Sequence, residues 1–139
     1  MKILLAVDGS ECTKKAVAFV VTHEAMLEGG ELVVVHVQPP LPPRVEGFVG
    51  HETVAQYHED EARKVLAPVE EFITRHGIKP RSRWVVGRPA HEIVRISVEE
   101  HASFIVMGTH GHGVLGRALL GSVAQGVLAH AEVPVLLVK

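Results

Sequence analysis

The stretch ILLAVDGS, residues 3–10, decides the fold class of this 139-residue chain. Five consecutive apolar residues, Ile3–Val7, end at the turn-forming sequence Asp8-Gly9-Ser10. A short, continuously apolar run of this kind is typical of a strand that is buried on both faces, as in a parallel sheet. Ser10 is suited to cap a following helix, and Glu11 is suited to interact with the positive N-terminal end of that helix. The stretch therefore predicts a buried strand that leads directly into a helix.

Apolar runs and amphipathic stretches alternate along the rest of the chain. The first helix carries an apolar stripe as far as Leu27 and is expected to end at Gly29-Gly30. Four further strands are predicted, at Leu32–Val37, Arg83–Val86, Phe104–Met107 and Val133–Val138. Of these, Arg83–Val86 is expected at an edge of the sheet.

Proline and candidate capping residues set the remaining boundaries. Residues 39–50 hold four of the eight prolines and are predicted to form a loop. The next helical pattern, 54–77, contains Pro68, so a kink or two helical pieces are expected. Ser122 with Gln125 is predicted to form a capping box for the last helix.

The resulting order is five strands separated by four helical connections, the third of which contains a helix beginning at Pro89. This order predicts a single α/β domain over residues 1–139, a sandwich in which helices cover both faces of a parallel sheet. In such sheets, ligands bind beyond the carboxyl ends of the strands, near the point where the strand order reverses. A site is therefore expected after Val7, Val37 and Met107.

Composition limits the classes of function. The chain has 14 Lys and Arg residues against 16 Asp and Glu residues, a formal net charge of -2, which argues against a general nucleic-acid binder. Its single cysteine, Cys12, excludes an internal disulfide and any multi-cysteine metal site. No run approaches the ~18 apolar residues of a membrane span, and Asp8 interrupts the first apolar run too early for an export signal. We therefore expect a cytoplasmic protein that contacts neither nucleic acid nor a membrane.

Glycine is concentrated in one segment. Six of the 13 glycines lie between residues 108 and 126, after the fourth predicted strand. Glycine lets backbone N–H groups approach an anion, and the N-terminus of the following helix adds partial positive charge. Ser122, His110 and Arg117 could add a hydroxyl, an imidazole and a guanidinium. The segment therefore suits a phosphate group, and it equally suits a close-packed connection between strand and helix.

Two common nucleotide-binding motifs do not account for these glycines. A Walker A loop needs Gly-Lys before Ser or Thr, and the chain contains no Gly-Lys pair. Residues 111–116 match the dinucleotide pattern G-x-G-x-x-G. That pattern also needs an acidic residue at the end of the next strand, and the next predicted strand leads to Lys139 instead. We interpret the match as accidental.

The spacing Gly108, Gly111, Gly121, Ser122 reads Gly-x2-Gly-x9-Gly-Ser. This pattern resembles the ATP-binding signature of the universal stress protein family. Five further stretches resemble that family, so that the likeness covers the whole chain: ILLAVDGSE (3–11), VVVHV (33–37), IVMGTHG (105–111), LLGSVA (119–124) and PVLLV (134–138).

The resemblance implies an α/β sandwich with a five-stranded parallel sheet in the order 3-2-1-4-5, ATP as ligand and a homodimer paired through strand 134–138. It also implies roles for particular residues. Asp8 would bind the ribose or adenosine moiety, and Val37 would offer backbone groups to the base. The remaining implied residues are Ala6 and Val7 at the adenine, Met107 and Gly108 beside the nucleoside, and His110, Gly111, Gly121, Ser122, Val123 and Ala124 around the ribose and phosphates.

The ten histidines do not form a recognised metal pattern. His51 and His58 lie seven residues apart, and His110 and His112 lie two apart, but neither pair supplies three ligands. His36, inside a buried strand, is interpreted as a core histidine whose ring is hydrogen-bonded. No metal site is predicted.

The leading hypothesis is a small ATP-binding sensor or regulatory protein of the stress response, with ATP accompanied by Mg²⁺. No catalytic residue is assigned, and hydrolysis is expected to be slow at most, because no lysine is placed to grip the phosphates. Two alternatives remain at this point. One is a dimeric interaction module that does not depend on ATP, and the other is a nucleotide-dependent transferase.

Overall fold

The computed structural model describes residues 1–111 and 120–139. Its strands form one parallel sheet in the order β3-β2-β1-β4-β5, so the predicted α/β class and strand order are confirmed. The third strand begins two residues earlier than predicted, and the fifth begins two residues later. The strands are β1 (Lys2–Ala6), β2 (Glu31–Gln38), β3 (Arg81–Val86), β4 (Phe104–Gly108) and β5 (Val135–Val138).

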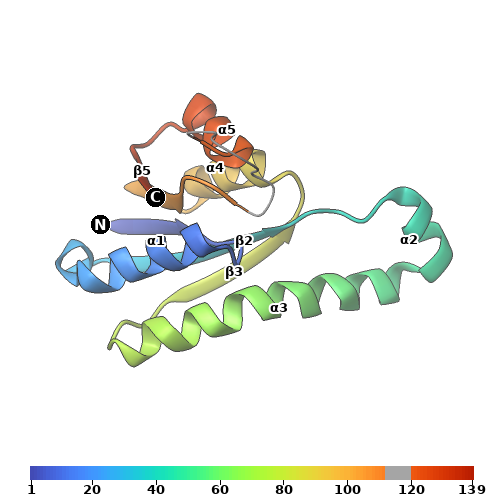
Figure 1. Cartoon of the computed structure of the whole chain (residues 1–139), viewed down its shortest axis with the longest axis horizontal. Coiled ribbons are helices and arrows are strands. Elements are labelled where there is room, and N and C mark those ends of the chain that lie inside the picture. The colour runs from blue at the N-terminus through green and yellow to red at the C-terminus, as the bar shows by residue number, and fades with distance from the viewer. Residues whose placement is uncertain (112–119) are drawn as a thin grey trace.

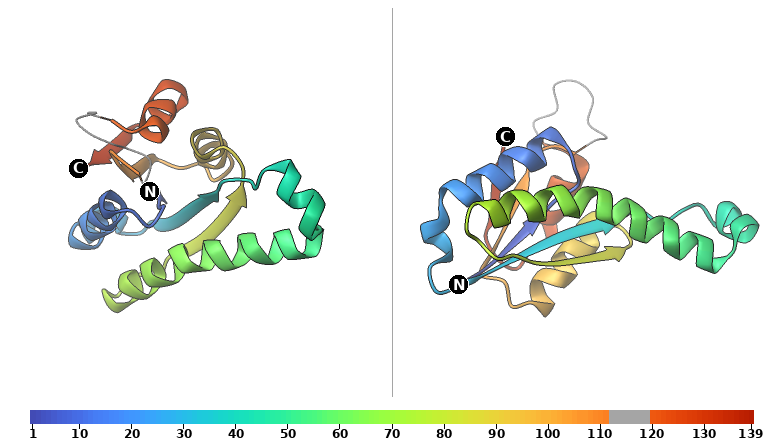
Figure 2. Two further views of the ribbon diagram at one scale, coloured as in Figure 1. Left: turned by 45° about the vertical axis from the view of Figure 1, so that its right-hand side comes forward. Right: turned by 90° about the horizontal axis from the view of Figure 1, so that it is seen from below.

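Helices cover both faces of the sheet (Figures 1 and 2). On one face lie α1 (Glu11–Thr22) and the long α3 (His51–Arg75), and on the other lie α4 (Pro89–Glu99) and α5 (Ser122–His130). The chain leaves β1 for α1 on the first face and leaves β4 for α5 on the second. The point between β1 and β4 is therefore the place where the direction of the connections reverses.

The four residues of β1 that follow Lys2 are all apolar, and their packing explains why. Ile3 and Leu5 pack against the layer that contains α1 and α3, whereas Leu4 and Ala6 pack against the layer that contains α4 and α5. All four side chains are buried. Because side chains alternate between the two faces of a strand and both faces are covered, each of these four positions must be apolar.

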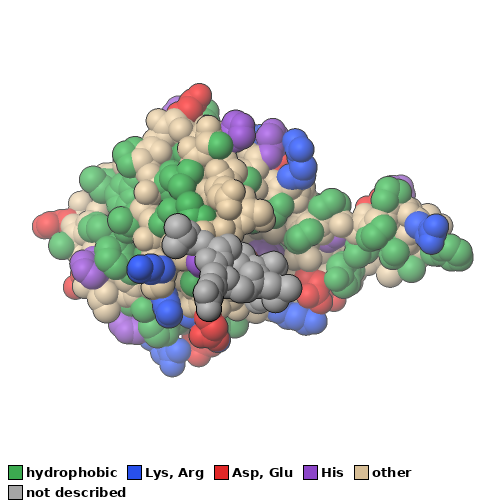
Figure 3. All heavy atoms as spheres, turned by 45° about the horizontal axis from the view of Figure 1, so that its top comes forward, with side chains coloured by type: hydrophobic (Ala, Val, Ile, Leu, Met, Phe, Trp, Pro, Cys, Tyr) green, Lys and Arg blue, Asp and Glu red, His purple; other side chains and the backbone are tan. Residues whose placement is uncertain are grey.

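Residues 39–50, predicted as a loop, contain a short helix, α2 (Pro43–Val49). Proline at the first position of a helix needs no hydrogen-bond partner and has a backbone angle that suits the helix, so the proline-rich sequence begins this helix instead of preventing it. Gly50, with φ 83°, lies between α2 and α3 in a conformation that favours glycine. The helix α2 and the beginning of α3 project from the body of the protein (Figure 1), and hydrophobic side chains gather on the projection (Figure 3), including Phe48 at 85% exposure.

The third helix, α3, runs without interruption through Pro68, so the expectation of two helical pieces is wrong. Proline removes one backbone N–H and leaves the carbonyl of Lys64 without a helical partner. Pro68 lies on the exposed side of the helix, where water can donate a hydrogen bond to that carbonyl instead. The buried stripe on the opposite side, from Val54 to Ile73, keeps the helix on the sheet.

Two helix ends differ from the predicted ones. The first helix stops at Thr22 and is followed by a separate 3₁₀ helix, η1 (Glu24–Leu27), although one continuous helix was predicted. The predicted capping box of the last helix is wrong. Gly121 is its N-cap and Ser122 is its first helical residue, while Gln125 donates its side-chain hydrogen bond to a backbone carbonyl of the preceding turn (3.0 Å). The hydroxyl of Ser122 is therefore not engaged in capping.

An ion-pair cluster joins the amino-terminal ends of three strands. The carboxylate of Glu100, a side chain only 9% exposed, accepts hydrogen bonds from Arg81 (2.5 and 3.1 Å) and Arg83 (2.8 Å). Lys2 lies 3.6 Å from Glu100, and Glu31 accepts a hydrogen bond from Arg81 (2.7 Å). Hydrogen bonds from Arg81 lower the pKa of Glu100 to about 2, against the opposing effect of burial, with Arg83 contributing further. The cluster fixes the end of the sheet that is remote from the expected site.

No helix within the described residues is long and apolar enough to cross a membrane.

Candidate functional site

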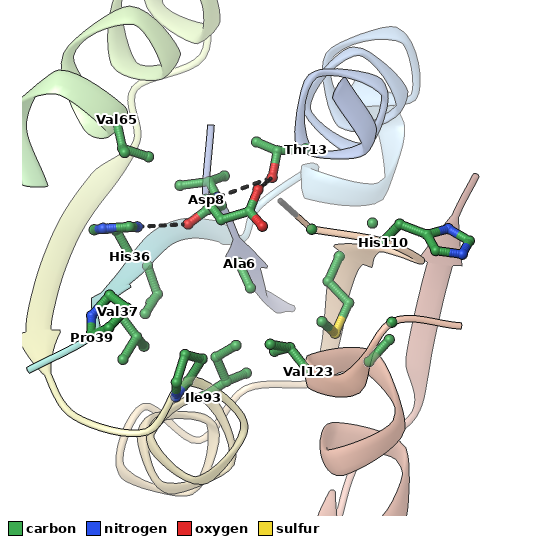
Figure 4. A pocket seen from close by; sticks show the side chains of 18 of the residues that line it. Ala6, Asp8, Thr13, His36, Val37, Pro39, Val65, Ile93, His110 and Val123 are labelled. Atoms are coloured by element: carbon green, nitrogen blue, oxygen red, sulfur yellow. Dashed lines mark hydrogen bonds between the residues drawn. The ribbon is translucent and has the colours of Figure 1, made fainter. Parts of the chain in front are cut away.

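A cavity of about 380 Å³ lies at the carboxyl ends of the strands (Figure 4). Its walls come from the ends of β1, β2 and β4 and from α3, α4 and α5. It therefore opens at the edge of the sheet where the sequence predicted a ligand, beside the reversal between β1 and β4.

The predicted site residues come from four separate stretches of sequence, and the structure brings them together around this one cavity. Arg117 falls outside the described residues. The twelve others all line the cavity: Ala6, Val7, Asp8, Val37, Met107, Gly108, His110, Gly111, Gly121, Ser122, Val123 and Ala124.

Asp8 is held firmly in the turn that follows β1. Its Oδ1 accepts hydrogen bonds from the backbone N–H of Ser10 (2.9 Å) and from the hydroxyl of Thr13 (2.6 Å), and the same hydroxyl accepts one from the N–H of Asp8 (3.0 Å). Ser10, not Asp8, is the N-cap of α1, because its hydroxyl accepts a hydrogen bond from the N–H of Thr13 (3.3 Å). The carboxylate of Asp8 is therefore positioned by the start of α1 without serving as its cap.

Two glycines, one at the end of β4 and one after it, are explained by close approach, not by unusual backbone angles. A Cβ on Gly111 would lie 2.5 Å from Oδ2 of Asp8. A Cβ on Gly108 would lie 2.6 Å from the Cβ of Cys12 and 2.9 Å from its backbone carbonyl carbon. Only glycine lets the chain after β4 pass this close to the end of β1 and to the first turn of α1.

Thr109 connects the start of α5 to the ends of β4 and β5 by backbone hydrogen bonds. Its carbonyl accepts a hydrogen bond from the N–H of Gly121 (2.7 Å), and its own N–H donates to Val138 at the end of β5 (2.9 Å). The N-terminus of α5, with the exposed Ser122, thus borders the cavity next to the glycines. Helix N-termini carry partial positive charge and N–H donors, so this side of the cavity suits an anion.

The described side chains around the cavity supply little positive charge. Among the described lining residues there is no Lys or Arg. His110 lines the cavity, and its Nδ1 is hydrogen-bonded to the hydroxyl of Thr109 (2.9 Å). Its ring points away from Asp8 (Figure 4). Backbone N–H groups, more than side-chain cations, would therefore have to hold an anion among these residues.

His36 is the satisfied core histidine that the sequence predicted. It is 5% exposed, its Nδ1 donates a hydrogen bond to the carbonyl of Val7 (2.9 Å), and its Nε2 is hydrogen-bonded to the side-chain amide of Gln38 (2.9 Å). The prediction placed His36 only in the core. The structure also places it in the wall of the cavity, beside Val37 and across from His110 (Figure 4).

Sequence reasoning missed about half of the wall. Gln38 and Thr109 lie at the strand ends where the sequence predicted a site, although neither was assigned as a site residue. The contributions of α3 and α4 depend on how those helices lie on the sheet, which no local pattern reveals. The residues missed are Thr13, Val35, His36, Gln38, Pro39, Glu61, Val65, Pro89, Ile93 and Thr109.

Within residues 1–111 and 120–139, no group of three or more His, Cys, Asp or Glu side chains could hold a metal ion. His58, one of the histidines considered as a ligand, is buried in α3, and neither of its ring nitrogens has a hydrogen-bond partner.

Comparison with known sequences identifies relatives over the full length of the chain. A model of the universal stress protein family matches residues 1–139. The chain is 40% identical over 138 residues to the universal stress protein in the QAH/OAS sulfhydrylase 3′ region of Thermus aquaticus, an alignment that covers 99% of this chain and 97% of that protein. It is 35% identical over 140 residues to the universal stress protein MJ0531 of Methanocaldococcus jannaschii, covering 99% and 81% of the two proteins.

Solved structures agree with this match. The structure of MJ0577 from Methanocaldococcus jannaschii aligns with a TM-score of 0.86 at 33% identity, over 99% of this chain and 94% of that one. The universal stress protein of Archaeoglobus fulgidus in complex with dAMP aligns with a TM-score of 0.73 at 28% identity, over 100% and 98% of the two chains. That protein binds an adenine nucleotide.

Proposed function

The chain belongs to the universal stress protein family, and from this premise we propose that its cavity binds adenine nucleotides, ATP among them, in a sensing or regulatory role. The observation that carries the proposal is the position of Asp8. Its carboxylate is fixed by two hydrogen bonds, and Gly111 passes so close to it that no side chain would fit between them. A carboxylate next to a glycine turn in the wall of one cavity suits a sugar next to a phosphate.

The remaining walls suit the other parts of a nucleotide. Apolar side chains from β2, α3 and α4, namely Val37, Val65 and Ile93, would enclose the base, and Asp8 would accept hydrogen bonds from ribose hydroxyls. The N-terminus of α5 would receive the phosphate nearest the ribose. The complex of the Archaeoglobus fulgidus relative with dAMP, an adenine nucleotide with one phosphate, supports this assignment.

The charge of the described wall bears on how a triphosphate would be held. Because the described part of the wall contains no Lys or Arg, a triphosphate would depend on backbone N–H groups and on an accompanying Mg²⁺ to offset its charge. We therefore expect AMP and ATP–Mg²⁺ to bind, and ATP to bind more weakly when Mg²⁺ is removed with EDTA.

Isothermal titration calorimetry tests the proposal directly. AMP, ATP–Mg²⁺ and GTP–Mg²⁺ are titrated into the protein after nucleotide carried over from the cell has been removed by unfolding and refolding. Saturable heat with AMP and ATP–Mg²⁺ is expected, with Asp8→Ala as the variant that weakens both. No heat from any adenine nucleotide up to millimolar concentration would contradict the proposal. The nucleotide released in the unfolding step, identified by mass spectrometry, would name the ligand bound in the cell.

A regulatory role implies that ATP is not consumed rapidly. Fast phosphoryl transfer needs cations at the transferred phosphate and a group that orients the attacking water, and no described lining residue is a Lys or Arg. We expect ADP to form at well below one turnover per minute, measured by chromatography of saturated protein. Turnover comparable with that of ordinary ATPases would contradict this part of the proposal.

The edge strand β5 suits a homodimer. β5 is paired on one side only, with β4, and all four of its residues are half-buried. The carbonyls of Pro134 and Val138 face β4, so by alternation the N–H of Leu137 faces the open edge. Pairing of two such edges would satisfy those groups.

Analytical ultracentrifugation tests the dimer. The unmodified protein is expected to sediment as a dimer, and Leu137→Pro, which removes an N–H from the open edge without removing one from the pairing with β4, is expected to sediment as a monomer. A monomer for the unmodified protein at micromolar concentration would exclude this interface.

A further inference from the structure

The ladder of backbone hydrogen bonds between β1 and β2 ends before β2 itself does. The last backbone hydrogen bond between them runs from the N–H of Val7 to the carbonyl of Val35 (2.9 Å). In a parallel ladder the next bond would join the N–H of Val37 to the carbonyl of Val7. Among the described residues no backbone hydrogen bond takes that place. β2 nevertheless continues to Gln38, paired on its other side with β3.

The carbonyl of Val7 is bound instead by a side chain. His36 Nδ1 lies 2.9 Å from it, and because a carbonyl oxygen only accepts, Nδ1 is the donor. The other ring nitrogen, Nε2, lies 2.9 Å from the side-chain amide of Gln38. With the proton of a neutral imidazole on Nδ1, Nε2 is an acceptor, so the amide must turn its NH2 group toward the ring to donate to it. Both Val7 and His36 are buried, so this contact is protected from water. His36 thus satisfies the acceptor that the N–H of Val37 would meet if the ladder continued.

The consequence falls on the backbone of Val37. The carbonyl of Val35 faces β1 and the carbonyl of Gln38 faces β3, where it accepts from Gly87 (3.0 Å). By alternation the N–H and C=O of Val37 face the side of β1, where β1 has already ended, and Val37 lines the cavity. An adjacent donor and acceptor on a strand edge match the edge of a nucleobase.

We propose that His36 is a positioning residue that keeps the Val37 backbone open for a base by holding the carbonyl of Val7. This inference rests on the proposed function in so far as the ligand is a nucleotide. Without the imidazole, the Val7 carbonyl is a buried acceptor that lacks a partner, and an unsatisfied buried acceptor is costly. Pairing with the N–H of Val37 removes that cost, and it extends the ladder by one bond and withdraws the edge from the ligand.

The experiment combines three variants. His36→Leu keeps an apolar side chain of similar size but removes the donor. His36→Asn restores a donor, because its side-chain nitrogen stands at the same distance from the backbone as Nδ1. His58→Leu is the matched control, since His58 is also buried (4% exposed) but has no hydrogen-bond partner on either ring nitrogen.

The first readout needs no ligand. Amide hydrogen exchange is followed by NMR at Val37, with Val35, which is paired with β1, as the internal reference. In the unmodified protein the amide of Val37 is expected to exchange faster than that of Val35. In His36→Leu it is expected to slow by at least about tenfold, as for a newly formed ladder bond, whereas His36→Asn and His58→Leu leave it unchanged.

The second readout is nucleotide affinity. His36→Leu is expected to weaken AMP binding about tenfold, the factor that one lost hydrogen bond typically accounts for, whereas His58→Leu, which removes no hydrogen bond, is expected to leave AMP affinity unchanged. His36→Asn is expected to restore binding to within a few fold.

Three results would overturn the role of His36. They are slow exchange of Val37 in the unmodified protein, unchanged exchange in His36→Leu, and a loss of AMP affinity that only parallels a loss of stability. If AMP does not bind the unmodified protein but the exchange pattern is as expected, the proposed nucleotide ligand fails while the role of His36 at the strand edge is supported.

Discussion

Gly111→Ala tests whether this glycine is present so that the chain can pass close to Asp8. The added Cβ would lie 2.5 Å from Oδ2 of Asp8, and ordinary contact begins at 3.4 Å, so the carboxylate must retreat by about 0.9 Å. Its other oxygen is bound at 2.6 Å by the hydroxyl of Thr13 and at 2.9 Å by the N–H of Ser10. A movement of that size breaks at least one of these two hydrogen bonds.

The magnitude follows from the kind of bond that is lost. A hydrogen bond to a charged group contributes roughly 1.5–3 kcal/mol, and a carboxylate that has moved also binds ribose hydroxyls less well. We expect AMP affinity to fall by about tenfold to a hundredfold. The backbone angles of Gly111 need no glycine, so the fold should remain intact.

Calorimetric titration with AMP measures the effect, and a double-mutant cycle with Asp8→Ala assigns its cause. When the carboxylate is absent, the added methyl group meets nothing in its place, and Gly111→Ala should cost little further affinity. The reasoning is refuted if Gly111→Ala binds AMP as tightly as the unmodified protein. It is also refuted if the substitution costs as much affinity in the Asp8→Ala background.

Three further substitutions test the packing and charge of the fold. Gly108→Ala places a Cβ against the backbone of Cys12 and should lower the free energy of unfolding by about 2–3 kcal/mol in a urea titration; an unchanged midpoint would contradict that contact. Thr13→Val removes the buried hydroxyl that bridges the turn after β1 and should cost about 1–3 kcal/mol, whereas Thr13→Ser, which keeps the hydroxyl, should cost less; no loss of stability in Thr13→Val would contradict the role of the hydroxyl. Glu100→Gln removes a carboxylate whose pKa is lowered from 4.5 to about 2, mainly by Arg81, so its contribution to stability is complete above pH 4.5 and is lost as the pH falls toward 2. The free energy of unfolding of the unmodified protein should therefore exceed that of Glu100→Gln by on the order of 2 kcal/mol at pH 7 and by almost nothing at pH 2. A difference in the free energy of unfolding that is constant with pH would contradict the assigned charge.

Much of the fold could be predicted from local patterns. The run Ile3–Val7 and the run Leu32–Val37 are apolar at nearly every position, which indicates strands covered on both faces, and the alternation with helices indicates a parallel sheet. The predictions that failed concern chain segments with conflicting signals. Prolines at 39–43 suggested a loop, yet one of them begins α2, and Pro68 lies on the solvent side of a helix that its buried stripe holds in place.

Part of the candidate site could also be predicted from the sequence, and part could not. Asp8 and the spaced glycines are visible in the sequence because a carboxylate after a buried strand and glycines before a helix are local features. The walls from α3 and α4 are not visible, since Val65 and Ile93 look like ordinary core positions until the helices are placed on the sheet.

The sequence by itself determined the class of fold, the edge of the sheet where a ligand would bind and the family to which the chain belongs, because each depends on residue type and spacing along the chain. Tertiary structure alone decided which atoms face one another. It placed Gly111 against Asp8, and it gave the Val7 carbonyl to His36, so that the backbone of Val37 remained available. Contacts of this kind join residues about 30 to 100 positions apart, and their geometry is set by how strands and helices pack, which periodicity does not encode.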